Sequence, residues 1–160
     1  MSGLNNPDGY ISNSPQWNMG AVGSPIFRAL PDWFGIPAAV DKYCAEIDHL
    51  PTWLAYDREM AVGFVSVKQH NAYCAEIYVM GVLPEYQRRG LGRALLNAAQ
   101  SWLRQQGTEY LQVKTLGPSR SDENYAQTRA FYEAAGFRPL EEIRSIWDEE
   151  NPCLIMILRL

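Results

Sequence analysis

The segment from Val79 to Arg93 concentrates residue types that bind phosphate groups. Gly81, inside a predicted strand, marks a bulge or a close approach of backbone, and Pro84 cannot donate to a ladder, so backbone groups here are left unpaired. Gly90 and Gly92 lack a Cβ and let successive amides converge where a helix begins, and the positive end of the helix dipole favours an anion there. The segment therefore predicts a pyrophosphate-binding loop.

Charge is concentrated in the same place. Residues 84–106 carry four arginines against Glu85, a net charge of +3, so the remainder of a chain whose total is -4 carries -7. Glycine before a helix is common, and first-turn arginines are often only solvated, so Gly-x-Gly alone is weak evidence. A dinucleotide fingerprint would need a third glycine where Leu95 stands, and a P-loop would need Gly-Lys-Ser/Thr. Neither NAD nor ATP is favoured.

Length and composition bound the remaining possibilities. A chain of 160 residues with 47% hydrophobic residues suits one globular domain. An isoelectric point near 5.2 argues against nucleic acid as a partner through a basic surface. Cys44, Cys74 and Cys153 lack the spacing of a zinc site or redox pair, so no metal is expected. No signal or membrane-spanning segment is apparent, so a cytoplasmic protein without membrane contact is expected.

The N-terminal residues 1–23 are rich in Gly, Asn, Ser and Pro, which predicts a mobile arm preceding a single domain over residues 24–160. The alternative is an ordered strand near Tyr10 and Ile11, with Trp17 and Met19 docked on a partner subunit. A first helix is predicted from Pro37 to His49 by apolar residues at helical spacing.

Alternating patterns then predict an antiparallel meander of three strands, over residues 53–56, 60–68 and 73–83. A strongly amphipathic helix follows from Leu91 to Gly107, then a strand over 110–116 and a polar loop over 118–123. Asn124 with Gln127 resembles a capping pair that opens a helix over 125–135. Strands over 142–147 and 153–160 complete an α+β or mixed α/β chain.

Gln87-Arg88-Arg89-Gly90-Leu91-Gly92 matches the Q/R-x-x-G-x-G/A signature of the GNAT superfamily of N-acetyltransferases, which the chain thus resembles. A second match runs from Phe131 to Phe137, a helix with a tyrosine and a closing Gly-Phe. The resemblance covers roughly residues 37–160. It implies a central, mostly antiparallel sheet of about six to seven strands, splayed between the fourth and fifth strands and flanked by helices.

The chain departs from the family pattern in two places. Tyr125 stands where many relatives carry an asparagine, with Asn124 beside it. The region before Trp53 is short for the usual strand and two helices, which predicts a reduced substrate-facing part.

The resemblance implies acetyl-CoA as cosubstrate. Its pantetheine arm would lie between the strand ending at Pro84 and the strand from Tyr110, bonded by backbone groups of Met80, Val82 and Leu83. The diphosphate would be held by the signature and its flank: Gln87, Arg88, Arg89, Gly90, Leu91, Gly92 and Arg93.

The resemblance also places Glu76 as the catalytic base, acting directly or through water. At pH 7 only about one lysine-like amine in 2,500 is neutral, so a base or a desolvating pocket is needed. The alternative for Glu76 is a surface ion pair. Strict alternation puts Glu76, Tyr78, Met80 and Val82 on one face, whereas a bulge at Gly81 would change that.

Tyr132, by the same resemblance, contacts the cofactor sulfur and donates to the departing thiolate. Full transfer from a phenol to a thiolate is uphill by about 2 kcal/mol, so hydrogen bonding can matter more than complete transfer. A backbone N-H near Val82 would stabilise the oxyanion.

The predicted function is direct transfer of an acetyl group from acetyl-CoA to a primary amine of a small molecule or a protein. The alternative is a non-catalytic acyl-CoA sensor or interaction module. The excess of acid outside the phosphate loop favours a cationic amine, with the acceptor side lined by Trp33, Phe34 and Tyr43 or rimmed by His70, Asn71 and Tyr73. An apolar last strand predicts a homodimer through edge pairing or exchange.

Overall fold

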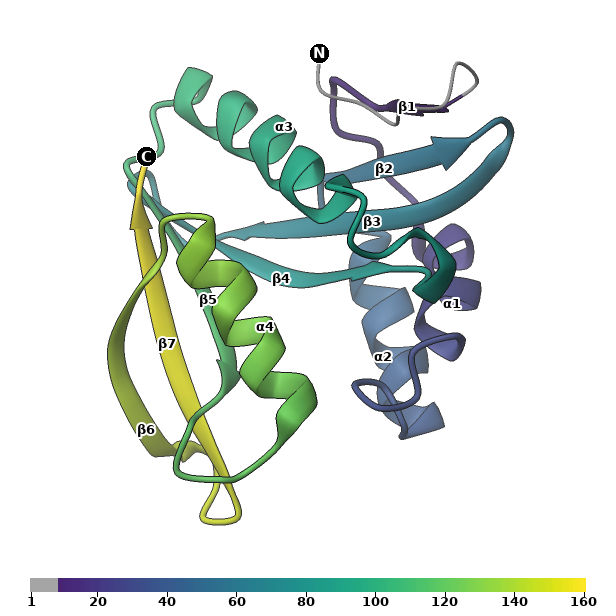
Figure 1. The fold of residues 1–160 in the computed structure, drawn as a ribbon. Coiled ribbons are helices and arrows are strands. Elements are labelled where there is room, and N and C mark those ends of the chain that lie inside the picture. The colour runs from purple at the N-terminus through teal and green to yellow at the C-terminus, as the bar shows by residue number, and fades with distance from the viewer. Residues whose placement is uncertain (1–8) are drawn as a thin grey trace.

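A computed structural model describes residues 9–160 and contains one mixed sheet of seven strands (Figure 1). The spatial order is β1-β2-β3-β4-β5-β7-β6, and every neighbouring pair is antiparallel except the parallel pair β4 and β5. The strands are β1 Gly9–Ile11, β2 Thr52–Asp57, β3 Met60–Gln69, β4 Cys74–Val82, β5 Tyr110–Leu116, β6 Arg138–Asp148 and β7 Asn151–Arg159. The predicted α+β class and its mostly antiparallel sheet are confirmed.

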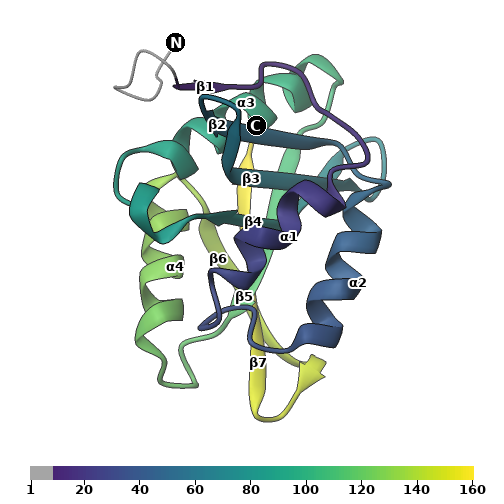
Figure 2. The ribbon, with the colours of Figure 1, turned by 90° about the vertical axis from the view of Figure 1, so that its right-hand side faces the viewer.

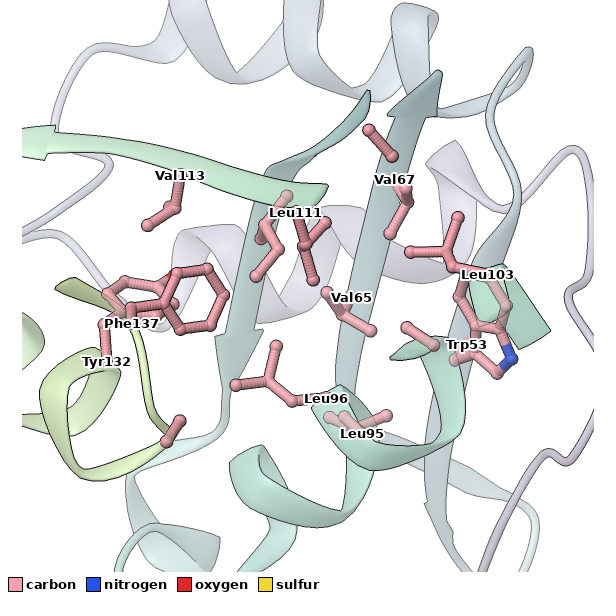
Figure 3. Close-up of a cluster of buried hydrophobic side chains, with 14 of the residues drawn as sticks. Trp53, Val65, Val67, Leu95, Leu96, Leu103, Leu111, Val113, Tyr132 and Phe137 are labelled. Atoms are coloured by element: carbon pink, nitrogen blue, oxygen red, sulfur yellow. The ribbon is translucent and has the colours of Figure 1, made fainter. Parts of the chain in front are cut away.

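Four helices cover the two faces of the sheet: α1 Gly20–Arg28, α2 Pro37–Ile47, α3 Leu91–Gln105 and α4 Glu123–Ala134. Helices α1 and α2 lie against strands β2 to β4 on one face, and α3 and α4 lie on the other (Figures 1 and 2). The α3/α4 face buries Trp53, Leu95 and Leu96 in the larger core, which Figure 3 shows. Phe27 and Phe64 centre the core under α1 and α2.

Strands β4 and β5 separate beyond a short paired stretch, as predicted. They pair from Cys74 with Tyr110 to Ile77 with Val113, and β4 then runs on beside β3 alone. In Figure 1 the two strands diverge on either side of α4. The register shifts between Ser66 and Val67 of β3, where Tyr78 of β4 is the extra residue, so the bulge predicted at Gly81 is wrong.

Gly81 is instead a place of close approach. It pairs in register with Phe64, and a Cβ on it would lie 3.0 Å from Leu30 and 3.3 Å from Ile26 of α1. The absence of a side chain at Gly81 lets α1 pack directly on β4. Because the extra residue is Tyr78, the side chains of Glu76 and Tyr78 lie on the α1/α2 face, which Gly81 also faces, and Met80 and Val82 lie on the α3/α4 face.

The N-terminal prediction differs from the structure over residues 9–23. Strand β1 pairs Tyr10 with Tyr56, as the alternative expected, and α1 begins at Gly20. The glycines that suggested a loop are needed for helix packing, because a Cβ on Gly20 would lie 2.1 Å from the Cys44 carbonyl oxygen of α2. The substrate-facing part is thus a strand and two helices and is not reduced. Residues 1–8 of the predicted arm lie outside the described residues.

Two further details correct the sequence reading. Asp122, rather than Asn124, caps α4 by accepting a hydrogen bond from the Tyr125 amide at 3.0 Å. Strand β7 is paired on both sides, so the last strand offers no free edge, and the outer strand is β6. Dimer formation remains a prediction, but pairing through a free edge of the last strand no longer supports it. Within residues 9–160, every helix is too short or too polar to cross a bilayer.

Candidate active site

The separation of β4 and β5 opens a groove of about 1120 Å³, which we call the splay groove. It is lined by the α1–α2 loop, β4, the loop before α3, β5, α4 and the turn between β6 and β7. Most of the predicted site residues meet here: Met80, Val82, Gln87, Arg88, Gly90, Leu91, Gly92, Arg93 and Tyr132. Three predicted residues are not among its lining: Glu76, Leu83 and Arg89.

The backbone of β4 turns part of its hydrogen-bonding capacity toward this groove. The Leu83 amide donates to the Val62 carbonyl of β3 at 2.8 Å and is therefore occupied within the sheet, while a cofactor contact by backbone groups of Leu83 remains a prediction. Hydrogen-bonded and non-hydrogen-bonded pairs alternate in an antiparallel ladder. The amides and carbonyls of Val82 and Met80 therefore point away from β3, toward the gap where β5 has departed.

The N-terminus of α3 presents free amides to the same gap. Its N-cap, Gly90, has φ +82°, a left-handed conformation that favours glycine, and no side chain caps the helix. The first amides of a helix have no intrahelical acceptor, and the helix dipole makes them attractive to anions. Glycine is favoured at position 92 for a different reason, which is close packing. A Cβ there would lie 3.1 Å from the Phe131 ring of α4.

The three arginines of the loop are held differently. Arg88, with φ +59°, lines the groove, and Arg93 donates from Nη1 to the Ala134 carbonyl at the end of α4 at 2.8 Å. The Arg89 guanidinium lies 5.2 Å from the centroid of the Tyr86 ring. Tyr86 in turn donates to Asp57 of β2 at 2.5 Å, which anchors the turn before α3. Of these three arginines, Arg88 and Arg93 line the groove.

Tyr132 lies in the wall of the groove on α4. Its ring contacts those of Phe131 and Phe137 edge to face, at centroid distances of 5.3 and 5.4 Å, and Figure 3 shows it beside Phe137. It is 5% exposed, and burial raises the pKa of this phenol well above its ordinary range. Tyr132 is therefore a neutral hydroxyl that can donate a hydrogen bond and does not ionise near neutral pH.

Glu76 lies beneath the acceptor side of the groove, where β4 and β5 are still paired, and is 7% exposed. One oxygen, Oε1, accepts from His70 Nε2 at 2.7 Å, Gln112 Nε2 at 3.1 Å and Lys114 Nζ at 3.1 Å. Burial alone would raise the pKa of Glu76, but these hydrogen bonds and the charge of Lys114 outweigh it and lower the pKa. Oε2 accepts no hydrogen bond from residues 9–160, so it is the oxygen available for a proton.

Sequence reasoning missed the contacts that cross the groove. Tyr125, Thr128 and Tyr132 fall at spacings of three and four residues and share one side of α4. Trp33 of the α1–α2 loop donates from Nε1 to Thr128 Oγ1 at 3.2 Å and ties that loop to α4. Tyr125 was noted from the sequence, and counting back four residues from Tyr132 would also have found Thr128, whereas nothing local in the sequence marks Trp33 as the partner of Thr128.

Thr115 is the other polar group in the wall that was missed. It is 3% exposed, lines the groove from β5, and its hydroxyl has no hydrogen-bond partner within residues 9–160. Such a group is rare in folded proteins because burial without a partner is unfavourable. All three cysteines are free thiols, and the described part of the chain contains no cluster of side chains suited to a metal.

Comparison with known proteins gives a consistent result. A family model described as an acetyltransferase (GNAT) domain matches residues 48–139. A mycothiol acetyltransferase from Beutenbergia cavernae is 40% identical over 90 residues, which are 55% of this chain but only 28% of that longer protein.

Two solved structures have the same fold. A protein from Desulfovibrio desulfuricans assigned to the GNAT family has a TM-score of 0.81 at 21% identity, with 94% of this chain and 98% of that chain covered. The yncA protein from Salmonella typhimurium, solved with its cofactor acetyl-CoA, has a TM-score of 0.69 at 15% identity, with 96% and 94% covered. At these identities the likeness establishes the fold.

Proposed function

The chain belongs to the GNAT family of acetyltransferases, and from that premise we propose that it transfers the acetyl group of acetyl-CoA to a primary amine. The observation that carries the proposal is the opening between β4 and β5, which leaves the backbone groups of Met80 and the Val82 amide without a partner strand beside the free amides of α3. A phosphorylated, amide-containing donor can satisfy both sets of groups at once.

The diphosphate of the donor would bind at the N-terminus of α3. The amides after Gly90, the Gln87 side chain and the cations of Arg88 and Arg93 supply the positive end of the site. Gln87 donates from Nε2 to the Val82 carbonyl at 3.0 Å, which links this loop to the strand that would bind the pantetheine arm. Arg89 would act from further away, through the charge it holds over Tyr86.

The acceptor amine must lose a proton before it attacks. Glu76 is proposed as the base, reached through water because it is not itself in the groove lining. The Oε2 atom would take the proton while His70, Gln112 and Lys114 fix Oε1. The neutral nitrogen then forms a bond to the thioester carbon, and the developing oxyanion can be stabilised by the Val82 amide.

Breakdown of the intermediate releases the CoA thiolate as the C–S bond breaks. Tyr132 would donate its hydrogen bond, or its proton, to that sulfur, and the attacking nitrogen then loses its second proton, which either goes to the thiolate or restores the Tyr132 hydroxyl. Its raised pKa keeps it protonated for this role, and the ring packing against Phe131 and Phe137 holds it in place. The products are the N-acetylated amine and CoA, and the reaction needs no metal.

Calorimetry with acetyl-CoA on the folded protein tests the donor half, and CoA release with a panel of amines tests the acceptor half. Binding without turnover of any amine, peptide or polyamine would favour an acyl-CoA sensor instead, a reading that the named acetyltransferase relatives do not favour. Absence of acetyl-CoA binding at high micromolar concentration would remove the basis of the proposal. The name of the curated relative adds mycothiol-type amines to the panel.

A further inference from the structure

The two ends of the splay groove differ in charge. The phosphate end carries Arg88 and Arg93, whereas the far end is lined by three aspartates, Asp32, Asp122 and Asp148. Two cations also line the far end, of which Lys114 is balanced by Glu76 and Arg120 offsets one of the three aspartates. Lys114 is paired with Glu76 at 3.1 Å, and the Arg120 guanidinium donates to the Asn151 side chain. The unbalanced charge at the far end is therefore negative.

Three tyrosines from three separate elements line this acidic end: Tyr43 of α2, Tyr78 of β4 and Tyr125 of α4. The Tyr43 and Tyr78 rings lie 5.8 Å apart in an edge-to-face arrangement. Tyr125 lines the same groove from α4, and burial raises its pKa, with a smaller contribution from Tyr43 in the same direction. The rings stay neutral and offer electron-rich faces, which attract organic cations.

Glu46 adds a carboxylate to the same cluster from α2. Burial raises the pKa of Tyr78 well above its ordinary range, and the nearby Glu46 carboxylate raises it further. Glu46 also raises the pKa of Tyr43, after the larger effect of burial. One carboxylate thus acts on two of the three rings, and the region combines aromatic faces with negative potential.

The position of this cluster along α4 relates it to the reaction centre. Tyr125 lies seven residues before Tyr132, with Thr128 and its partner Trp33 between them. Seven residues of α-helix correspond to about 10 Å along the axis. A group bound among the tyrosines would therefore lie roughly one short alkyl chain away from an amine that reacts beside Tyr132.

We propose that the acceptor is a small amine that carries a second ammonium group, of the diamine or polyamine class. The nitrogen that attacks must be neutral, so it cannot be the partner of the acidic, aromatic end throughout the reaction. A second ammonium group keeps its charge and can bind to the rings of Tyr43, Tyr78 and Tyr125 near Glu46. This inference rests on the proposed acetyltransferase activity and specifies its acceptor.

The test compares three acceptors of similar length, cadaverine, pentylamine and aminovalerate, by CoA release at fixed saturating acetyl-CoA. The second ammonium predicts a kcat/KM for cadaverine at least about tenfold above that for pentylamine, with aminovalerate the poorest. Equal or better use of pentylamine or aminovalerate would overturn the proposal. Turnover of none of the three would also overturn it, while calorimetry with acetyl-CoA separately reports whether the donor site works.

Single substitutions test whether the preference for cadaverine arises at the cluster of Tyr43, Tyr78, Tyr125 and Glu46. Glu46→Gln should reduce the preference for cadaverine over pentylamine severalfold and leave acetyl-CoA affinity unchanged, and Tyr125→Leu should do the same. Glu109→Gln is the matched control, because Glu109 is exposed between α3 and β5 and, unlike Glu46, does not act on any of the three tyrosines. A cadaverine preference that survives both groove variants, or falls equally with Glu109→Gln, would contradict the assignment to this cluster.

Discussion

The phosphate end and the acceptor end of the splay groove present different kinds of chemical group to a ligand. At the proposed phosphate end the groups available to a ligand are mainly backbone amides, freed because β4 loses its neighbour and α3 begins with an uncapped glycine. At the acceptor end they are side chains that come from α2, β4, β5, α4 and the β6–β7 turn. A site made of backbone needs particular residues at fixed spacing in one segment, whereas a site made of side chains can be assembled from anywhere in the chain.

This contrast predicts that variants will separate donor binding from acceptor use. Changes near α3 should alter acetyl-CoA affinity, and changes on the α1/α2 face of the sheet should alter amine turnover alone.

Tyr132 lies where the two ends meet, and its substitution should have the largest effect. Tyr132→Phe removes the hydroxyl and preserves the ring packing with Phe131 and Phe137. Loss of proton donation to the thiolate should lower kcat about 100-fold, with acetyl-CoA affinity nearly unchanged. Steady-state kinetics with calorimetry measures both. A kcat within twofold of wild type would exclude Tyr132 as the donor, because general acid catalysis typically contributes about 100-fold or more.

Glu76→Gln belongs to the acceptor end and should lower kcat about 20-fold without changing acetyl-CoA affinity. The effect is expected to be smaller than for Tyr132, because the hydrogen bonds that lower the pKa of Glu76 also make it a weak base. If Glu76 serves only as an ion-pair partner of Lys114, stability should fall while kcat per folded molecule stays constant.

The same variant has a signature in stability against pH. The lowered folded-state pKa means that ionised Glu76 stabilises the fold above its unfolded pKa of about 4.3, and this contribution is lost as pH falls through the folded pKa. Glu76→Gln should therefore flatten the wild-type loss of stability below about pH 4.3, measured by denaturant unfolding at several pH values. An unchanged slope would contradict the lowered pKa.

Substitutions of Arg88 and Arg89 distinguish a direct contact with phosphate from the effect of overall positive charge. Arg88→Gln should weaken acetyl-CoA binding about tenfold, because Arg88 lines the groove and can make a charge-assisted bond to phosphate. Arg89→Gln makes the same change of charge in a side chain that lies over Tyr86, and it should have a clearly smaller effect. Equal losses in calorimetric titrations would show that only the summed charge matters.

Thr115→Val should have the smallest effect of these substitutions, and it should stabilise the protein rather than impair it. Removing a buried hydroxyl that has no partner should stabilise the free protein by about 1 kcal/mol, or raise Tm by about 2 to 4 °C. Thr52→Val is the control, since the Thr52 hydroxyl bonds to the Leu50 carbonyl and to Ser66, so this variant should be destabilised. Destabilisation of both variants in thermal melts would indicate that Thr115 has a hydrogen-bond partner in solution.

The same contrast explains how much could be predicted from the sequence. The strands, the long α3 and the phosphate loop were predicted because their signals are local: alternation, helical spacing and glycines before a helix. The α1 helix was missed because Gly20 is fixed by its distance to α2, and the helix also contains Gly23 and Pro25. No local pattern reports a contact across the fold.

The acceptor end escaped prediction for a related reason. Glu76 meets Gln112 and Lys114 only through the register of the parallel β4–β5 pair, and it meets His70 through the turn before β4. Even the face on which Glu76 lies depends on an extra residue at Tyr78 rather than at Gly81. Register and bulge position are decided by packing between strands, so sequence spacing alone left both open.

The central claim is that the glycine-lined start of α3 binds the diphosphate of acetyl-CoA through its backbone. Gly90 and Gly107 flank α3 with nearly equal φ values, +82° and +85°, and each has open space where a Cβ would lie. Gly90→Ala and Gly107→Ala should therefore destabilise the fold similarly, by about 1 to 2 kcal/mol. Calorimetric titration with acetyl-CoA should show weakened binding for Gly90→Ala and wild-type affinity for Gly107→Ala. Equal affinities for the two variants, or no binding by the wild-type protein, would contradict the claim.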